Sequence, residues 1–373
     1  MQTMNRHIGI VGGGPGGLLL ARLLQRRGVK VTVLERDSHA AERPQGGSLD
    51  LHDETGQKAM QAAGLEDAFM ACARPEDQGD RLYDETGRLI FDHDGHGMNR
   101  PEIDRGDLRR ILLESLRPGT VRWSQRVRGV TVSGKKVSVL CPDGPELYDV
   151  VIGADGAWSR VRPFLTEIGP AYAGVVFLEL GFEEKRDPHP ATLVGRGKMF
   201  AVGDNRALIL QRNGGGHIRF YAGMRMAEEA ALALREVSPK SARAHMAQNF
   251  SSWSPDLRRL LAEGDFLGVR PLYAMPIGTK WRAHPAVMLL GDAAHLMSPF
   301  SGEGVNLALA DALDLANALM KENGMTSLQD YEAVLISRAE RAAMRAASGL
   351  AKVFSSHGAA PVLAHYQERL AGG

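Results

Sequence analysis

Three glycines, Gly12, Gly14 and Gly17, stand near the start of the chain at a spacing that suits a phosphate. Gly12 permits a tight turn, Gly14 lets a pyrophosphate approach the backbone, and Gly17 allows a helix to pack closely on a strand. An acid, Glu35, follows where it could accept hydrogen bonds from a ribose. These residues predict a dinucleotide site, and they do not decide between NAD(P) and FAD.

The sequence around the glycines predicts the elements that must position them. The apolar run 8–11 is typical of a buried parallel strand, and the leucines of 18–24 form the apolar stripe of a helix. A second apolar run, 29–34, predicts the strand that ends in Glu35. A glycine turn that only packs is the competing interpretation, but it leaves three positions without side chains where a phosphate needs room. Free N–H groups and the dipole at the helix N-terminus favour the pyrophosphate.

A second ligand-binding turn is predicted near the end of the chain. The apolar run 287–291 leads into Asp292 and a loop rich in proline and glycine, and 307–320 then predicts a helix. Backbone N–H groups and the helix dipole favour negative charge in front of 302–306. Another buried strand, 150–152, ends at Asp155 and Gly156, a turn that is common in proteins of many functions. Ser159 is expected to start a short basic helix.

Several charged residues could belong either to a ligand site or to the surface. Arg43 and Asp50 lie in the loop after the nucleotide motif, where ordinary loop charges are the simpler interpretation. Arg109 lies in the first turns of a predicted helix that Asp104 caps, and it could reach a phosphate or remain a solvated charge. His295 could act as a general base, but its place in the loop favours a structural role.

Length and composition limit the classes of protein. The 373 residues carry a net charge of +1, so neither a nucleic acid nor an anionic membrane is an expected partner. Cys72 and Cys141 lie far apart, which predicts neither a disulfide nor a metal site. No apolar stretch reaches the roughly 18 residues of a membrane span, and 1–6 is too short and polar for a signal peptide. A monomeric cytoplasmic protein is expected.

The middle of the chain has a different sequence pattern. Between 168 and 266, short β-rich runs alternate with glycine and proline turns around one predicted helix, 240–250. This pattern predicts an antiparallel sheet in a second domain or lid. The strand arginines there, Arg219 among them, could contact a substrate, but salt bridges on a sheet surface explain most of them more simply. The last segment, 328–370, is predicted to be mostly helical.

Three motifs follow one another along the chain: the glycine motif with Glu35, the Asp155 turn and the Asp292 loop. In their order and spacing they resemble the motifs of class A flavoprotein monooxygenases. The segments 46–52, 101–109 and 291–306 are similar, nearly residue for residue, to those of the tetracycline-inactivating members. The resemblance covers nearly the whole chain and implies an α/β fold with a Rossmann-like FAD-binding domain and a β-rich substrate domain. The expected boundaries are 1–65, 92–166 and 267–322 for the FAD-binding domain, 66–91 and 167–266 for the substrate-binding domain, and 323–373 for a C-terminal helical segment bridging them.

The resemblance also assigns residues. It implies that the nucleotide is FAD, with Glu35 on the adenosine ribose and Asp292 on the ribityl and pyrophosphate region. Arg43 matches a position implicated in handling NAD(P)H. The histidine and glutamine that contact tetracycline in that group are not recognisable in this sequence, and Glu303 stands where glutamine is often found. The predicted cofactor-binding residues are Gly12, Gly14, Pro15, Gly16, Gly17, Glu35, Arg36, Asp50, Arg109, Asp155, Asp292, Pro299, Gly302, Gly304, Val305 and Asn306, and the predicted substrate contacts are Arg219, Phe220, Pro299 and Phe300.

The function implied by the resemblance is hydroxylation of an electron-rich aromatic or polycyclic enol or phenol. NAD(P)H reduces the FAD, oxygen adds to give a flavin C4a-hydroperoxide, and one oxygen atom enters the substrate, with a tetracycline-like antibiotic as a special case. No catalytic side chain is assigned, because the cofactor carries the chemistry. Two alternatives remain open: a flavoprotein reductase or dehydrogenase that inserts no oxygen, and a flavin-binding sensor or scaffold.

Overall fold

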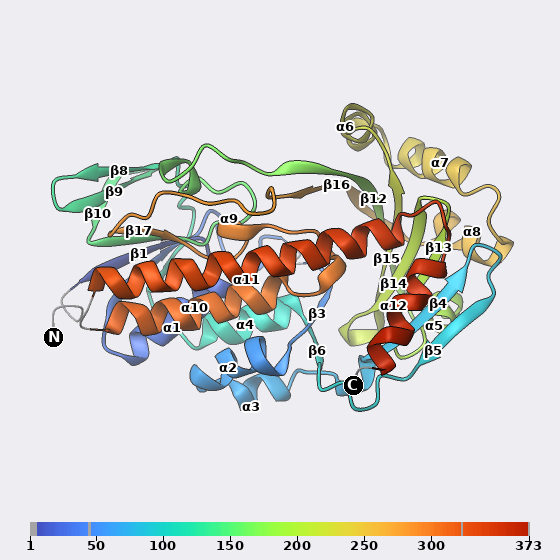
Figure 1. Ribbon diagram of the computed structural model, residues 1–373, viewed down its shortest axis with the longest axis horizontal. Helices are drawn as coiled ribbons and strands as arrows, with labels where there is room; N and C mark the ends of the chain where they lie inside the picture. Colours follow the sequence, from blue (N-terminus) through green and yellow to red (C-terminus); the bar gives the residue numbers. More distant parts are fainter. Residues whose placement is uncertain (1–5, 44–45, 322–323, 372–373) are drawn as a thin grey trace. The chain divides into compact units, whose positions relative to one another are not determined.

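The computed structural model describes residues 6–43, 46–321 and 324–371, and the chain divides into two compact units (Figure 1). Unit 1 comprises Met1–Cys72, Arg105–Ala171 and Ala274–Ala346, and unit 2 comprises Ala73–Asp104, Tyr172–Tyr273 and Ala347–Gly373. This division differs from the expected boundaries. Residues 66–72 and 167–171 fall in unit 1, residues 92–104 and 267–273 fall in unit 2, and the C-terminal segment is divided after Ala346.

Unit 1 is built on a five-stranded parallel sheet in the order β7-β2-β1-β11-β17. The central strand β1 pairs with β2 on one side and with β11 on the other, so the strand order reverses beside β1. Open parallel sheets bind ligands at such a reversal, where the loops that follow the two strands diverge. The predicted strands are confirmed as β1 (His7–Val11), β2 (Lys30–Leu34), β11 (Val150–Gly153) and β17 (Val287–Leu289), and β7 (Val121–Arg122) is the fifth strand of the sheet.

Helices α1 (Pro15–Arg26) and α10 (Gly304–Met320) pack against each other in unit 1 (Figure 1). The predicted stripe of α1 is buried, since Leu18, Leu19, Leu20, Leu23 and Leu24 are all at most 2 % exposed. The long helix α11 (Gly324–Val353) runs beside α10, and its residues up to Ala346 belong to unit 1. The other elements of unit 1 are β3 (Ser48–Asp50), a π-helical turn (Asp53–Gln57), α2 (Lys58–Ala62), α3 (Glu66–Met70), α4 (Arg105–Glu114), α9 (Asp292–His295) and the antiparallel strands β8 (Val130–Ser133), β9 (Lys136–Cys141) and β10 (Gly144–Tyr148).

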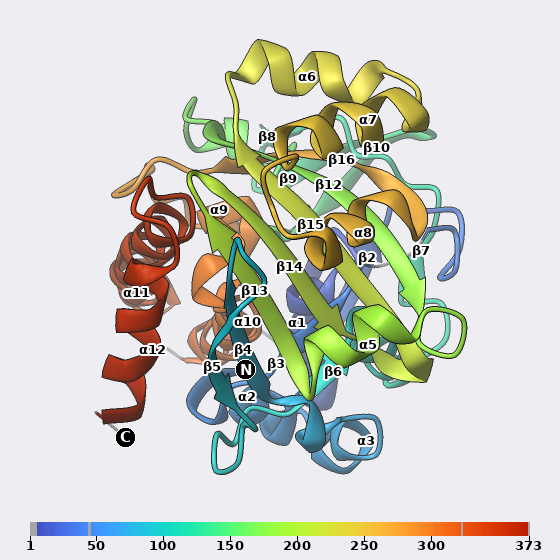
Figure 2. The same cartoon turned by 90° about the vertical axis from the view of Figure 1, so that its right-hand side faces the viewer.

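Unit 2 holds a seven-stranded sheet in the order β16-β12-β15-β14-β13-β4-β5, with β13 and β4 parallel. Helices α6 (Glu228–Glu236), α7 (Pro239–Asn249) and α8 (Pro255–Ala262) cover one face (Figure 2). Side chains alternate between the two faces of a strand, so the apolar core uses alternate residues of each strand. The remaining elements are β4 (Gly79–Asp84), β5 (Leu89–His93), β6 (Glu102–Asp104), β12 (Ala171–Glu183), α5 (Pro188–Val194), β13 (Gly197–Gly203), β14 (Arg206–Arg212), β15 (His217–Arg225), β16 (Asp265–Ala274) and α12 (Ala360–Ala371).

The β-rich segment contains more helix than the sequence predicts. The expected helix 240–250 is confirmed as α7, but α5, α6 and α8 also lie between 168 and 266. A start signal was present for α8, because Ser254 caps the helix and Pro255 occupies its first position. The short basic helix expected at Ser159 is wrong. The Ser159 hydroxyl instead accepts the N–H groups of Val161 and Arg162, and a single 3-10 turn, Arg162–Phe164, follows.

The sequence predicts that the protein has no membrane-spanning segment. Within residues 6–43, 46–321 and 324–371, no helix combines the length and the apolar character that crossing a membrane requires.

Candidate functional site

The glycine turn between β1 and α1 leaves open space at the helix N-terminus. A Cβ atom at Gly12 would lie 2.3 Å from the Ala154 carbonyl oxygen, and one at Gly17 would lie 2.3 Å from the Gly12 carbonyl oxygen. A Cβ atom at Gly14 would meet nothing within 4 Å. Gly12 also adopts a φ of +108°. The protein's own packing therefore requires Gly12 and Gly17, whereas Gly14 faces a space that a phosphate could enter.

Two other predicted residues of this turn have different surroundings. Gly16 is buried, and a Cβ atom there would lie 2.7 Å from Leu290 and 3.0 Å from the Ala308 carbonyl oxygen of α10. Its smallness therefore allows α1 and α10 to pack closely. Pro15 occupies the first turn of α1, where the missing N–H group costs no helical hydrogen bond. The predicted contacts of both residues with the cofactor remain predictions.

Glu35, at the end of β2, is buried beside the glycine turn. Its Oε2 accepts the N–H of Gly13 at 2.5 Å, and its Oε1 accepts the N–H of Asp37 at 3.0 Å. Each carboxylate oxygen has a second lone pair. Glu35 therefore holds the turn through the backbone and keeps acceptor capacity for a ribose hydroxyl.

Arg109 projects from α4 and is 3 % exposed. Its Nε donates to the carbonyl oxygen of Gly13 at 3.1 Å, and Nη1 donates to that of Ala40 at 2.8 Å. Nη2 donates to Asp37 Oδ2 at 3.3 Å. The guanidinium thus ties the glycine turn to the loop after β2. Its predicted contact with the cofactor remains a prediction.

Asp37 organises the arginines of this loop and was not singled out by the sequence analysis. It is 2 % exposed, and its carboxylate accepts Nε of Arg43 at 3.0 and 3.1 Å as well as Nη2 of Arg109. Arg36 lies 3.9 Å from the same carboxylate. The sequence signal that could have identified Asp37 is a second acid two residues after Glu35 in an arginine-rich loop. Arg36 and Arg43 both keep exposed side chains.

The Asp155 turn follows β11, across the reversal point from the glycine turn. Oδ2 of Asp155 accepts the N–H of Arg160 at 2.6 Å. Oδ1 is buried and has no hydrogen-bond partner within the part of the chain that the structure describes. Burial raises the pKa of this carboxyl above its usual value. A buried acceptor without a partner is costly, so a ligand hydroxyl would be stabilising here.

Arg162 joins this turn to α9, which sequence reasoning did not foresee. Its Nη2 donates to the Ala157 carbonyl oxygen at 2.7 Å, and its Nη1 donates to that of Ala293 at 3.1 Å. The side chain is 4 % exposed, and burial lowers its pKa. The two acceptors lie far apart in the sequence, so only the folded chain shows that Arg162 connects them.

The loop after β17 presents its aspartate to solvent. Gly291 takes a φ of +58°, and α9 begins at Asp292. Asp292 is exposed and has no hydrogen-bond partner among the described residues. Pro299 is exposed as well, and a Cβ atom at Gly304 would meet nothing within 4 Å. The loop therefore offers a free carboxylate and an accessible N-terminus of α10.

Asn306 is buried, and its amide is used by the protein. Oδ1 accepts the N–H of His52 at 2.8 Å, while Nδ2 donates to the carbonyl oxygens of Asp50 and Gly302 at 2.9 and 3.3 Å. Asn306 thereby brings Asp50 and the start of α10 together, and Asp50 Oδ1 would lie 3.6 Å from a Cβ atom at Gly302. For cofactor binding, the main-chain N–H groups of Gly304, Val305 and Asn306 remain at the N-terminus of the helix.

The predicted substrate residues of unit 2 lie on opposite faces of β15. Arg219 is half-buried on the face away from the helices, and its guanidinium has no hydrogen bond or ion pair within the described residues. Phe220 has no exposed surface and packs edge-to-face on Phe182 in the core. This placement corrects the prediction for Phe220, because a side chain enclosed in the core has no surface to offer a substrate. Phe300, in unit 1, is half-buried.

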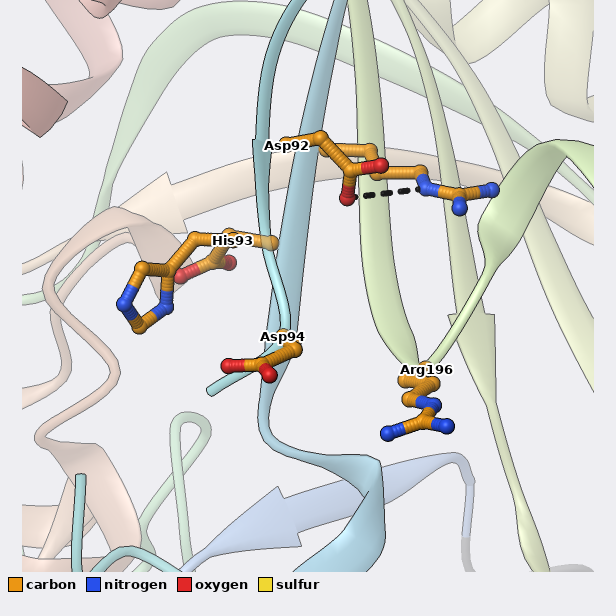
Figure 3. Close-up of a pocket in the computed structure, with 7 residues that line it drawn as sticks. Asp92, His93, Asp94 and Arg196 are labelled. Carbon is orange, nitrogen blue, oxygen red and sulfur yellow. Dashed lines mark hydrogen bonds and ion pairs between the residues drawn. The ribbon is translucent and has the colours of Figure 1, made fainter. Parts of the chain in front are cut away.

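Unit 2 contains a cavity of about 430 Å³ that could form an alternative site (Figure 3). Arg81 is already bound to Asp92 at 3.1 Å. His93 and Asp94 extend to one side of β5, whereas Arg196 lies on the other. Because these charged groups do not converge on one point, the cavity does not have the character of a specific site. It is lined by Gly79, Asp80, Arg81, Asp92, His93, Asp94 and Arg196.

Comparison with known proteins identifies the family of the chain. Residues 6–346 match the family model described as FAD binding domain. The chain belongs to the FAD binding domain family. Within it, the chain is 33 % identical to monooxygenase asqM of Emericella nidulans over 84 % of this chain and 83 % of that protein. It is 30 % identical to monooxygenase penA of Penicillium thymicola over 96 % of this chain and 98 % of that protein.

Solved structures share the fold of this FAD binding domain protein. HpxO of Klebsiella pneumoniae, in complex with FAD and uric acid, superposes with a TM-score of 0.82 at 23 % identity, covering 98 % of this chain and 93 % of that one. Tetracycline destructase Tet(55) superposes with a TM-score of 0.79 at 19 % identity, covering 99 % and 96 %. The resemblance to class A FAD monooxygenases that the motifs predict is therefore confirmed, as is the fold class.

The residues of unit 1 fit FAD on structural grounds as well. The space in front of Gly14 suits a pyrophosphate, and the unpartnered Oδ1 of Asp155 suits a hydroxyl donor. Asp292 is free to accept further hydroxyl groups. A dinucleotide bearing a ribityl chain provides both the phosphates and the hydroxyls that these groups need.

Proposed function

We propose that this protein is an FAD-dependent monooxygenase that hydroxylates an electron-rich aromatic or polycyclic enol or phenol at the expense of NAD(P)H. The substrate RH, NAD(P)H, a proton and O2 give ROH, NAD(P)+ and water, so one oxygen atom enters the product and the other leaves as water. The observation that carries the proposal is the reversal point of the unit 1 sheet. The turn after β1 leaves open space at Gly14, the turn after the neighbouring β11 leaves Oδ1 of Asp155 without a partner among the described residues, and the relatives of the chain are monooxygenases.

When bound, the FAD supplies hydride acceptance and oxygen activation. The protein supplies its binding and orientation. The N-terminus of α1 at Gly14 would hold the pyrophosphate, Glu35 the adenosine ribose, and Asp155 and Asp292 the remaining hydroxyls. The N-terminus of α10 would stabilise negative charge on the ring, because its unpaired N–H groups and helix dipole favour an anion.

NAD(P)H is proposed as a transient donor rather than a resident cofactor. The chain has one dinucleotide fingerprint, Gly12 to Gly17, and the proposal assigns that fingerprint to FAD. A second dinucleotide must then bind without a Rossmann motif of its own. The exposed side chains of Arg36 and Arg43 beside the buried Asp37 provide positive charge for its phosphates. Arg43 therefore remains the proposed NAD(P)H contact.

The substrate is proposed to carry an acidic oxygen, as a phenol or enol does. Arg219 has no protein partner among the described residues and is half-buried, so a substrate oxyanion would satisfy it. A further relative, 28 % identical over 93 % of this chain, is 3-amino-4-hydroxybenzoate 2-monooxygenase of Streptomyces cremeus, whose named substrate is a phenol. Inactivation of a tetracycline-like antibiotic, an acidic polycyclic enol, is the most specific form of the proposal, and the fold of Tet(55) supports it.

The test is turnover by the purified holoprotein with NADPH or NADH and a panel of phenolic and polycyclic compounds. Oxygen uptake, nicotinamide oxidation and product mass are measured together. The expected result is substrate-dependent nicotinamide oxidation with equal oxygen uptake and a product heavier by one oxygen atom. Oxidised substrate without oxygen insertion would instead identify a reductase or dehydrogenase. A flavin-loaded protein that turns over no compound would support a sensor or scaffold.

A further inference from the structure

A buried polar network lies behind the Asp292 turn in unit 1. His295, the last residue of α9, is 6 % exposed, and its Nε2 lies 2.6 Å from Oδ2 of Asp311. Asp311, on α10, has no exposed surface. Nδ1 of His295 is buried and has no hydrogen-bond partner in the described part of the chain. The ring is therefore bound to the protein through Nε2 alone, and the unsatisfied Nδ1 makes its burial costly.

Asp311 connects His295 to the turn itself. The same Oδ2 atom accepts the N–H of Gly291 at 3.0 Å. Gly291 stands directly before Asp292 and takes a φ of +58°, in the left-handed region that favours glycine. The carboxylate of Asp311 therefore holds the residue whose backbone angle directs Asp292 outward.

Arg338, on α11, provides a positive charge for the carboxylates of Asp311 and Asp314. Its Nη2 donates to Oδ1 of Asp311 at 2.8 Å, and its Nη1 donates to Oδ2 of Asp314 at 2.9 Å. A buried carboxylate is strongly destabilising unless it is paired and hydrogen-bonded. Asp311 meets that requirement with His295 on one oxygen and Arg338 on the other.

The pKa directions agree with an ion pair. Burial alone would lower the pKa of His295, but Asp311 outweighs it and raises that pKa above its ordinary value. Burial alone would raise the pKa of Asp311, but His295 and Arg338 lower it. Both directions favour a charged imidazole beside a charged carboxylate. The charged, titratable or polar groups facing this pair from the surrounding elements are those of Arg162, Asp292, Asp314, Tyr331, Arg338 and Glu340.

We propose that His295 is a positioning residue for FAD, which acts through Asp311 to hold the Gly291 turn so that Asp292 reaches the cofactor. This inference rests on the proposed function only in placing FAD at Asp292. His295 touches neither the cofactor nor the substrate in this role. It keeps the Asp311 carboxylate charged and aimed at the Gly291 N–H group.

The test compares FAD binding by three apoprotein variants. His295→Leu removes the imidazole, and His295→Gln keeps an N–H donor for Asp311. His284→Leu is the matched control, because it removes a half-buried imidazole of unit 1 that packs edge-to-face on Phe164. The dissociation constant of FAD is measured by flavin fluorescence, and the unfolding temperature of each apoprotein by circular dichroism.

His295→Leu is expected to weaken FAD binding about tenfold or more, which corresponds to ~1.4 kcal/mol. His295→Gln should recover part of the affinity, because it donates to Asp311 without the charge of the imidazole, and His284→Leu should leave it within about threefold of the parent. If His295→Leu lowers the unfolding temperature while FAD affinity is unchanged, the network is only structural and the proposal is overturned.

A pH series on His295→Gln keeps the proposal testable if His295→Leu does not fold. The raised pKa means that the charged imidazole supports the turn at low pH and loses its charge as pH rises through that pKa. FAD affinity of the parent protein should therefore fall as pH rises through that raised pKa, toward the affinity of His295→Gln, whose side chain donates to Asp311 without a charge. His295→Gln should show no such fall. Identical pH profiles would overturn the proposal.

Asp292→Ala separates this inference from the proposed function. If Asp292→Ala loses FAD and His295→Leu does not, only the role of His295 is overturned. If Asp292→Ala binds FAD like the parent protein, FAD does not lie at Asp292, and both proposals are overturned.

Discussion

At the residue scale, the polar side chains predicted to bind FAD or substrate fall into two groups. Arg109 and Asn306 are buried, and their hydrogen-bonding groups are bound by the protein's own backbone and carboxylates. Asp292, Oδ1 of Asp155 and the guanidinium of Arg219 have no such partners within the described residues. The first group holds loops in place, and the second is available to ligands. Substitutions in the two groups should therefore have different consequences.

Asp292→Ala should release FAD and leave the apoprotein stable, because the side chain is exposed and bonds no protein atom among the described residues. Loss of a charged hydrogen bond of ~1.5–3 kcal/mol predicts FAD binding weaker by about tenfold or more. Flavin absorbance of the purified variant measures this loss, and circular dichroism checks the fold. Asp143→Ala, which removes an exposed carboxylate in the turn after β9, is the control and should purify with a full complement of flavin. An equally yellow Asp292→Ala protein would show that the cofactor lies elsewhere.

Arg219→Met should raise KM for the hydroxylated substrate and leave flavin content unchanged. The methionine keeps an apolar stem on the sheet but loses the charge, so a paired substrate oxyanion would lose ~1.5–3 kcal/mol, or about tenfold or more in KM. Steady-state kinetics with the substrate found by the compound screen would measure this. Arg235→Met, on the exposed face of α6, is the control. Equal losses of flavin and of substrate affinity would remove Arg219 from the substrate contacts.

At the scale of elements, the β1–α1 turn has two kinds of glycine. Gly17 lies against the backbone of Gly12, which cannot move aside as a side chain could. Gly14 has no neighbour in the direction of a Cβ atom, and its φ of −84° is open to any residue. The same change, glycine to alanine, therefore tests packing at one position and ligand access at the other.

Gly17→Ala should lower the free energy of unfolding of the apoprotein by about 3 kcal/mol or more, because overpacking here meets rigid backbone. Gly14→Ala should lower it by no more than about 1 kcal/mol, the cost of a poorer N-cap, yet weaken FAD binding by about tenfold or more. Urea unfolding of the apoproteins and FAD titration give both quantities. Unimpaired FAD binding by Gly14→Ala would mean that no phosphate approaches this turn.

At the scale of the whole molecule, bound FAD should stabilise the folded state. The proposed ligands come from segments of unit 1 that lie far apart in the sequence, around Gly14, Asp155 and Asp292. A ligand that binds only when these segments are assembled stabilises the folded state by mass action. In the apoprotein, Oδ1 of Asp155 has no hydrogen-bond partner among the described residues, and the N-terminus of α10 is accessible. FAD could provide hydrogen bonds to both groups.

Removing FAD should therefore lower the unfolding temperature, and adding it back should restore the temperature in a concentration-dependent way. At a free FAD concentration one hundred times the dissociation constant, the expected gain is about 2.7 kcal/mol. Thermal unfolding followed by circular dichroism at increasing FAD measures this gain, and AMP, which lacks the ribityl chain and flavin ring, is the control ligand. A melting temperature that does not change at saturating FAD would contradict the proposed site.

The parallel strands of unit 1 could be predicted because each is buried on both faces and so forms an uninterrupted apolar run. In β15 the prediction for Phe220 came from the resemblance, and the strand pattern could not test it. Phe220 stands between Arg219 and Tyr221, and an alternating strand does not say which face the helices will cover. Only the packing of α6, α7 and α8 on the sheet showed that Phe220 faces the core.

The strand–glycine–helix nucleotide motif, the acid that follows it and the Asp292 loop could be predicted from the order of residues alone, since these features depend on local spacing and on the absence of side chains. The tertiary structure decided which polar groups are already bound and which remain free. Asp37 meets Arg109, Arg162 meets Ala293, and His295 meets Asp311 and Arg338 only when distant segments are brought together. Such contacts depend on distances of a few ångströms across the fold, which no local spacing in a sequence specifies.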